Sequence, residues 1–186
     1  MVVAEDEALI RMDLVEMLTE EGYEVVGQAA TGEAALTLVS QLAPEVVLLD
    51  VRMPVMDGIS AAEAISALGT TAVVMLTAFS QRDLVSRASE AGVAGYLVKP
   101  VSAADLVPAI EVARARFAER SQLTAQVDNL EERMAERKAI ERAKGRLVAG
   151  YGMDEAQAYS WLQREAMNRR MSMAQVAAVV NAEAES

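Results

Sequence analysis

Short apolar runs alternate with amphipathic helical patterns over residues 1–118. The apolar runs are rich in Val, Leu and Ala, as strands buried on both faces often are, and they cover 2–4, 23–29, 46–51, 72–77 and 95–98. Between them, apolar residues recur at helical spacing in the segments 9–21, 32–43, 58–68, 81–91 and 103–118. This alternation predicts an α/β domain whose five-stranded parallel sheet is covered by helices on both faces.

The next part of the chain is rich in charged residues and contains a single helix breaker, Gly145, between residues 113 and 148. It predicts one long helix or two abutting helices. An apolar stripe with 4-3-4 spacing runs along it for about two heptads, at Leu123, Val127, Leu130 and Met134. The stripe fits two interpretations, packing within the chain or the seam of a coiled-coil dimer.

Two further helices are predicted after the glycines of 150–152 end that segment. Each begins with a capping-box pattern, a cap residue followed three positions later by Gln. The pairs are Asp154 with Gln157 and Ser172 with Gln175. The pattern predicts a small three-helix unit on a helical linker.

The chain of 186 residues contains no Cys and no His. The composition excludes disulfides, cysteine nucleophiles, Ser-His-Asp triads and histidine-ligated zinc, so any metal must be a hard cation bound through oxygen. No apolar run approaches the roughly 20 residues that span a bilayer, and no signal-peptide pattern opens the chain. We therefore expect a soluble, cytoplasmic protein with no membrane partner.

The net charge of −11 is unevenly distributed. Residues 1–113 carry a net charge of −12, whereas residues 114–186 carry +1. Within the latter, residues 137–170 carry 8 basic and 4 acidic side chains. The asymmetry indicates two domains with different partners, and any nucleic-acid surface is expected within 137–170.

Polar residues stand at the carboxyl ends of the predicted strands, the edge where open parallel sheets bind ligands. Glu5 and Asp6 follow the first strand, Asp50 the third, Thr77 the fourth and Lys99 the fifth. Converging carboxylates suit Mg²⁺, which would leave Asp50 ionised as a nucleophile toward phosphorus. Lys99 and Thr77 would then contact phosphoryl oxygens. Each residue alone also fits an ordinary role as a cap, strand or surface residue, so only the combination indicates a site.

The same residues lie in motifs that resemble the receiver domain of two-component response regulators. The motifs are at 5–7, 48–58, 76–78 and 96–100. The resemblance covers 1–118 and implies a flavodoxin-like (βα)5 fold with a cis peptide bond before Pro100. It further implies that a sensor histidine kinase phosphorylates Asp50. Thr77 and Lys99 are implied as phosphate-contacting catalytic residues, Thr77 and Tyr96 as the switch, and the Mg²⁺ ligands as Glu5, Asp6, Asp50 and the backbone carbonyl of Arg52.

The sequence departs from the receiver pattern at its start, because only four residues precede Glu5. Receivers ordinarily have a fuller first strand. We therefore expect a shortened first strand, which would weaken the sheet beneath the acidic residues.

The basic part of the carboxyl-terminal third does not fit a DNA-binding helix-turn-helix. Such a motif places basic or amide residues at the start of its second helix, whereas the last predicted helix, within residues 173–186, contains no Lys or Arg and two Glu. Aromatic residues could instead stack on unpaired RNA bases, at Tyr151, Tyr159 and Trp161. For Trp161 a place in the helical core is favoured.

Residues 125–186 resemble the ANTAR output domain, most clearly in the motif Ala143-Lys144-Gly145 followed by Ala158 and Ala166. Members of that family bind paired RNA hairpins with six-nucleotide loops, commonly as dimers, and prevent transcription termination. The resemblance implies RNA contacts at Lys144, Gly145, Arg146 and Arg164. A helical coiled-coil linker, 119–137, would join this domain to the receiver.

These features predict a phosphorylation-controlled response regulator that acts as a transcription antiterminator, with a homodimer formed on phosphorylation. The alternative is a regulator whose helical tail docks on a protein partner instead of RNA. An independent metal-dependent enzyme is disfavoured because no general base is evident, so we expect no enzymatic activity beyond self-dephosphorylation.

Overall fold

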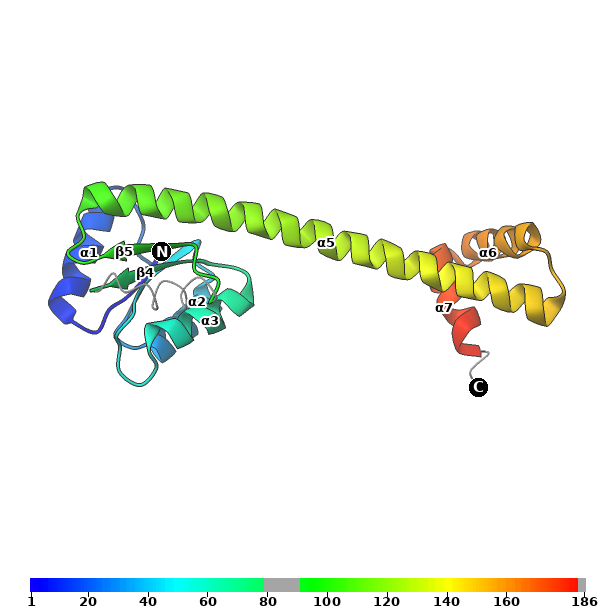
Figure 1. The fold of residues 1–186 in the computed structure, drawn as a ribbon, viewed down its shortest axis with the longest axis horizontal. Coiled ribbons are helices and arrows are strands. Elements are labelled where there is room, and N and C mark those ends of the chain that lie inside the picture. The colour runs from blue at the N-terminus through cyan, green and yellow to red at the C-terminus, as the bar shows by residue number, and fades with distance from the viewer. Residues whose placement is uncertain (79–90, 184–186) are drawn as a thin grey trace. The chain divides into compact units, whose positions relative to one another are not determined.

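A computed structural model describes residues 1–78 and 91–183 of the chain (Figure 1). Contacts within it divide the chain into two compact units, Met1–Gln122 and Leu123–Ser186. Residues 81–90 of the helix predicted at 81–91 lie outside the described residues. In the described part of the chain, no helix is both long and apolar enough to cross a membrane.

The first unit contains the predicted parallel sheet, with strand order β2-β1-β3-β4-β5. The strands are β1 (Val2–Ala4), β2 (Gly27–Ala29), β3 (Val46–Asp50), β4 (Ala72–Thr77) and β5 (Gly95–Val98). The chain adds β2 on one side of β1 and then β3, β4 and β5 on the other side. The carboxyl ends of β1 and β3 therefore flank a topological switch point. The receiver-like topology is thus confirmed.

The first strand is as short as predicted, and its length limits its neighbour. All three residues of β1 pair with both β2 and β3. The second strand was predicted over 23–29 but begins only at Gly27, because β1 offers three partners, Val2, Val3 and Ala4. Residues 23–26 therefore form no part of the sheet.

Strand residues alternate between two apolar clusters, one on each face of the sheet. Val47 and Leu49 face the cluster that packs against α2 (Gly32–Leu42) and α3 (Gly58–Leu68). Val46 and Leu48 face the cluster formed with α1 (Ala8–Glu20) and the start of α5. Figure 1 shows the same two layers. Successive side chains point to opposite faces of the sheet. Because both faces are buried, nearly every strand position is apolar and the strands appear in the sequence as continuous apolar runs.

Side chains cap the helices that lead away from the sheet. Thr31 caps α2 by accepting a hydrogen bond from the backbone N–H of Ala34 at 3.1 Å. Asp57 caps α3 by accepting from Ser60 N–H at 2.8 Å. The peptide bond between Lys99 and Pro100 is cis, as the resemblance implied.

The helix predicted to end at residue 118 instead continues as α5, Ala103–Tyr151. Of the two interpretations of the charged segment, one long helix is correct. No Pro or Gly interrupts the chain between residue 118 and Gly145, so nothing in the sequence stops the helix after the receiver. The predicted linker, 119–137, is therefore helical throughout and continuous with the helical segments on both sides.

The apolar stripe of α5 lies outside the described core of the second unit. Its four residues are 53–59% exposed: Leu123, Val127, Leu130 and Met134. Among the described residues of this unit, the interpretation that the stripe packs within the chain is therefore not borne out. The coiled-coil interpretation stays a prediction.

The second unit has the predicted helices, with α6 (Glu155–Arg169) and α7 (Met173–Glu183) packed against the last part of α5. Both capping boxes are present: Asp154 and Gln157 exchange hydrogen bonds of 2.8 and 2.9 Å, and Ser172 and Gln175 do so at 3.1 and 2.8 Å. The core consists of Ala143, Leu147, Ala158, Leu162, Ala166, Val176 and Ala177, with Trp161 partly buried against it.

Candidate functional site

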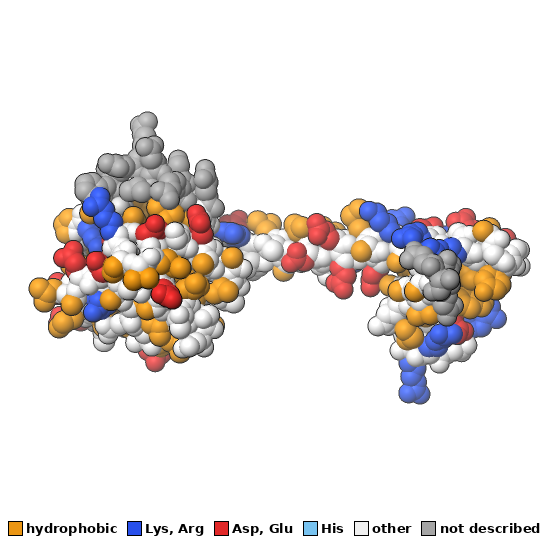
Figure 2. Space-filling model, turned by 90° about the horizontal axis from the view of Figure 1, so that it is seen from below, with side chains coloured by type: hydrophobic (Ala, Val, Ile, Leu, Met, Phe, Trp, Pro, Cys, Tyr) orange, Lys and Arg blue, Asp and Glu red, His pale blue; other side chains and the backbone are white. Residues whose placement is uncertain are grey.

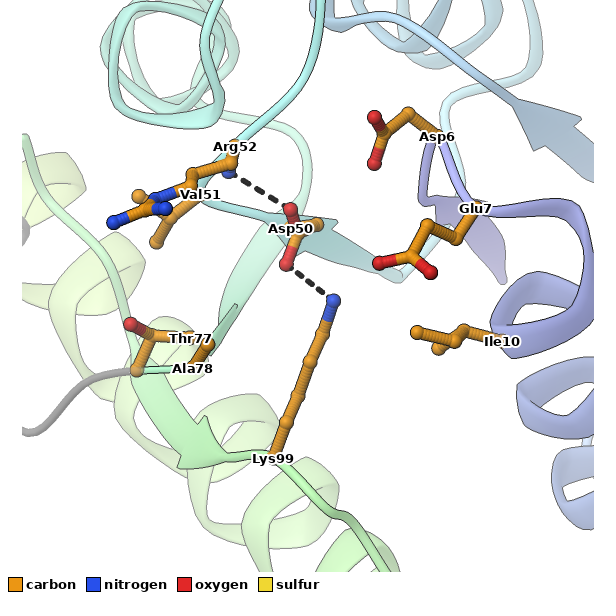
Figure 3. Close-up of a pocket in the computed structure, with 9 residues that line it drawn as sticks. All are labelled: Asp6, Glu7, Ile10, Asp50, Val51, Arg52, Thr77, Ala78 and Lys99. Atoms are coloured by element: carbon orange, nitrogen blue, oxygen red, sulfur yellow. Dashed lines mark hydrogen bonds and ion pairs between the residues drawn. The ribbon is translucent and has the colours of Figure 1, made fainter.

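The carboxyl ends of the strands converge on a cavity of about 420 Å³ in the first unit (Figure 3). The predicted residues Asp6, Asp50, Thr77 and Lys99 all line it. They come from separate elements: the loop after β1, the ends of β3 and β4, and the segment after β5. The fold thus brings together side chains that are more than 90 residues apart in the chain.

Lys99 provides the positive charge of this cavity. Its Nζ lies 2.6 Å from Asp50 Oδ1 and 2.5 Å from Glu5 Oε2. Both carboxylates are almost fully buried, with Glu5 0% and Asp50 5% exposed. Uncompensated carboxylates at this depth would be strongly destabilising, so the ammonium is the group that compensates the charge of this pair.

Burial and ion pairing oppose each other at these groups. Burial raises the pKa of Glu5 above its ordinary value, and the hydrogen bond from Lys99 offsets only part of the increase. Burial lowers the pKa of Lys99, but its hydrogen bonds to Asp50 and Glu5 outweigh that effect, so its pKa lies above the ordinary value. Lys99 is therefore protonated at neutral pH.

The backbone around Asp50 fixes the orientation of its carboxylate. Oδ2 accepts a hydrogen bond of 2.8 Å from the N–H of Arg52, while Oδ1 faces Lys99. Gly58 makes this loop possible: a Cβ there would lie 1.9 Å from the carbonyl oxygen of Asp50. The sequence motif included Gly58, but only the structure shows that any side chain at this position would displace Asp50.

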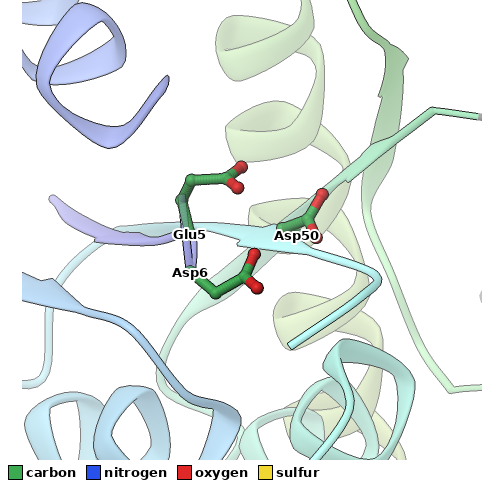
Figure 4. A group of neighbouring side chains, drawn as sticks. All are labelled: Glu5, Asp6 and Asp50. Carbon is green, nitrogen blue, oxygen red and sulfur yellow. The ribbon is translucent and has the colours of Figure 1, made fainter. Parts of the chain in front are cut away.

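Three carboxylates of this region form a candidate cation site, because their oxygens are the ligand atoms that hard cations prefer. One oxygen from each of Glu5, Asp6 and Asp50 lies within 4.8 Å of the others (Figure 4). Asp6 is exposed, whereas Glu5 and Asp50 are buried. Mg²⁺ keeps several waters and binds one or two carboxylates, so an open site with one exposed acid fits it. These residues would hold the ion, and the ion would neutralise charge on a bound phosphoryl group.

The two residues predicted to form the switch lie on adjacent strands. Thr77 ends β4 and is 6% exposed at the cavity wall. Tyr96 lies on β5, where it pairs with Met75 in register, and its side chain is 54% exposed and does not line the cavity. The side chain of Tyr96 thus points to solvent, and Tyr96 lies two residues before the end of β5.

The predicted RNA contacts lie in the second unit, where Figure 2 shows many Lys and Arg side chains. The Nζ of Lys144 lies 2.9 Å from Glu155 and 3.1 Å from Glu141, and hydrogen bonds to these carboxylates raise the pKa of Lys144. Arg146 donates a hydrogen bond to the backbone carbonyl of Asn181. Arg164 is exposed on α6.

The helical repeat separates the three predicted contacts on α5. Successive residues turn by about 100°, so Lys144 and Arg146 lie about 160° apart around the helix. Gly145 lies between them and is exposed, and a Cβ there would meet no atom within 4 Å. Packing therefore does not explain a glycine at this position, which costs about 1 kcal/mol of helix stability relative to alanine.

Comparison with known proteins identifies a family domain in each unit. Residues 1–111 match the response regulator receiver domain, and residues 128–180 match the ANTAR domain. The chain belongs to the two-component response regulators with a receiver and an ANTAR output domain, a regulatory family.

Among individual proteins, the chain is 54% identical over 178 residues to the transcriptional regulatory protein PdtaR of Mycobacterium tuberculosis, which covers 96% of this chain and 87% of that protein. The regulator is thus of the PdtaR type.

Solved receiver structures resemble the first unit. The receiver domain of the response regulator NarL from Mycobacterium tuberculosis is 36% identical with a TM-score of 0.59, covering 61% of this chain and 94% of that chain. CheY of Borrelia burgdorferi, solved in complex with CheX, BeF3 and Mg, is 28% identical with a TM-score of 0.56, covering 59% of this chain and 84% of that chain.

Replacing Lys99 by Met tests the electrostatic balance of the cavity. The substitution keeps the side-chain length but leaves Glu5 and Asp50 without their partner, so we expect the free energy of unfolding at pH 7 to fall by about 3 kcal/mol. Mg²⁺ should stabilise Lys99→Met more than the wild type, because no ammonium competes with it. Urea denaturation with and without Mg²⁺ measures both effects.

The exposed lysine variant Lys138→Met is the matched control and should change stability by less than about 0.5 kcal/mol. Equal stabilisation of wild type and Lys99→Met by Mg²⁺ would contradict competition between the ammonium and the ion.

Proposed function

We propose that a sensor histidine kinase phosphorylates Asp50 and that this modification controls RNA binding by the ANTAR unit. The observation that carries the proposal is the position of Asp50, oriented by the Arg52 N–H and paired with Lys99 beside Glu5 and Asp6. Mg²⁺ bound by Glu5, Asp6, Asp50 and the Arg52 carbonyl would leave the Asp50 carboxylate available as nucleophile.

Phosphorylation would change the partners of Lys99 and Thr77. A phosphoryl group on Asp50 brings new acceptor oxygens into the cavity, and these would attract the ammonium and the Thr77 hydroxyl. Movement of Thr77 would vacate space that the ring of Tyr96 occupies on turning inward from its outward position. The switch then biases a two-state equilibrium on the face of the receiver that carries β5 and α5.

Asp50→Asn tests the phosphoacceptor directly. The amide cannot form the acyl phosphate, so incorporation of labelled phosphate from acetyl phosphate in the presence of Mg²⁺ should be abolished. Asp57→Asn is the control, since Asp57 caps α3 and its replacement should leave labelling near the wild-type level. Labelling that persists in Asp50→Asn would reject the assignment.

The ANTAR unit is proposed to bind RNA hairpins and to act in antitermination. Support comes from the family match and from the basic segment 137–170, whose charge of +4 contrasts with the acidic receiver. Gly145 adds a structural argument, because an exposed helical glycine with open space around it permits close approach of an RNA backbone. Lys144 would exchange Glu141 and Glu155 for phosphates on binding.

Two substitutions in α5 separate RNA binding from stability. Lys144→Ala should weaken binding of a synthetic two-hairpin RNA with six-nucleotide loops and reduce the dependence of log K on log salt by about one unit. Gly145→Ala should raise helix stability by up to about 1 kcal/mol while weakening binding. Fluorescence anisotropy and thermal unfolding measure the two quantities.

Lys138→Ala removes the same charge from an exposed position six residues earlier and should affect RNA binding less than Lys144→Ala does. If the wild type bound no RNA, with or without phosphorylation, this proposal would fail. A salt-insensitive complex with a protein would then favour a protein-docking regulator.

A homodimer is proposed to form along the exposed apolar stripe of α5. The stripe, residues 123–134, has coiled-coil spacing and side chains that are 53–59% exposed, so a second copy would bury an otherwise hydrated seam. Two linked ANTAR units would bind paired hairpins through a high effective concentration.

Sedimentation of the full chain, with and without acetyl phosphate and Mg²⁺, tests the dimer. Leu130→Gln places an amide in the seam and should shift the protein toward monomer. Glu131→Gln alters the adjacent exposed residue, outside the stripe, and should leave the mass distribution unchanged. A dimer that withstands Leu130→Gln as well as Glu131→Gln would contradict this interface.

A further inference from the structure

The second unit contains a cavity of about 430 Å³ between the end of α5, α6 and α7. Its volume falls in the range of small-ligand sites, roughly 300–1,000 Å³. Apolar side chains form part of its wall, and two guanidinium groups and two aromatic rings complete it: Arg146, Arg169, Tyr151 and Trp161. Of these four residues, only Arg146 is among the RNA contacts that the ANTAR resemblance implied.

The cavity wall is built for an anion. Arg146 is anchored by donating to the carbonyl of Asn181, and Arg169 Nε donates to Glu165 at 2.6 Å. Both guanidinium groups are thereby held at the wall before any ligand arrives. Among the described residues that line the cavity, none carries a carboxylate, so its charge favours a phosphate group over an acidic or neutral peptide.

Two features of the wall suit a flat ring. Tyr151, the last residue of α5, is 76% exposed, although a purely structural tyrosine in so small a unit would be expected to pack on the core. Gly150 precedes it inside the helix, and a Cβ at this position would meet no atom within 4 Å. Packing therefore does not account for a tyrosine at position 151 or a glycine at position 150. An exposed ring beside a glycine with open space around it offers a surface on which a base can stack.

We propose that this cavity binds one unstacked nucleobase of an RNA loop together with its phosphate. Tyr151 and Trp161 contact the base, and Arg146 and Arg169 bind the phosphate. This combination of stacking and charge is the usual way in which proteins bind unpaired nucleotides. The inference rests on the proposed RNA binding and deepens it, because it places one loop nucleotide in this cavity and adds Arg169 to the RNA contacts.

Trp161 is the single tryptophan of the chain, so its fluorescence reports on the cavity directly. The full-length protein is titrated with a synthetic two-hairpin RNA with six-nucleotide loops, and with the same RNA carrying abasic loops. The intact RNA should quench Trp161 emission. The abasic RNA should bind more weakly and leave the emission unchanged, since it offers phosphates without bases.

Matched variants assign the contacts. Tyr151→Ala should weaken binding by about tenfold or more, whereas Tyr159→Ala, which removes a half-exposed ring of α6 that does not line the cavity, should not. Arg169→Gln should weaken binding and reduce its salt dependence. Arg170→Asn removes the same charge next to the cavity, and Asn tolerates the positive φ of 54° at that residue, so its effect should be smaller.

The outcomes separate the two proposals. Wild-type binding with quenching, lost selectively in Tyr151→Ala and Arg169→Gln, supports the nucleobase site. Wild-type binding that neither variant weakens, or that leaves Trp161 emission unchanged, overturns the site while RNA binding stands. Absence of binding by the wild type, phosphorylated or not, overturns both. Thermal unfolding of each variant verifies that the second unit remains folded.

Discussion

The ion pairs of Lys99 with Glu5 and Asp50 are the interaction on which the receiver site depends. A parallel sheet that changes direction between β1 and β3 brings buried carboxylates together at one edge, and their mutual repulsion would destabilise the fold if no cation compensated it. The ammonium fulfils this role in the described structure. A group that changed the charge of Asp50 would therefore change the electrostatic balance around Lys99.

Close backbone packing adds a second constraint on Asp50. Gly58 lies against the carbonyl of Asp50, where a Cβ would lie 1.9 Å from the oxygen. Glu5 and Asp6 follow the three-residue strand β1. Of the strands that pair on both sides, β1 has the fewest paired residues. Helix α5 belongs to both units.

The sequence predicted the sheet, and the convergence of polar residues at its carboxyl edge, because the signals for both are local and strong. Strands buried on both faces appear as apolar runs, and a parallel sheet must gather the residues at the ends of its strands. Glu5, Asp50, Thr77 and Lys99 therefore met as expected. The sequence could not show that Gly58 touches Asp50 or that Lys99 bridges two carboxylates, because these contacts depend on distances between loops. In the helical unit, the buried or exposed state of the α5 stripe and the ion pairs of Lys144 depended on tertiary packing in the same way.

The proposed control of RNA binding depends on the charge state of Asp50. Its most direct test is the affinity of the full chain for a two-hairpin RNA before and after treatment with acetyl phosphate and Mg²⁺, in the wild type and in Asp50→Asn. We expect tighter binding on phosphorylation of the wild type and no response in Asp50→Asn. An RNA affinity that is the same for phosphorylated and unphosphorylated wild type would contradict it.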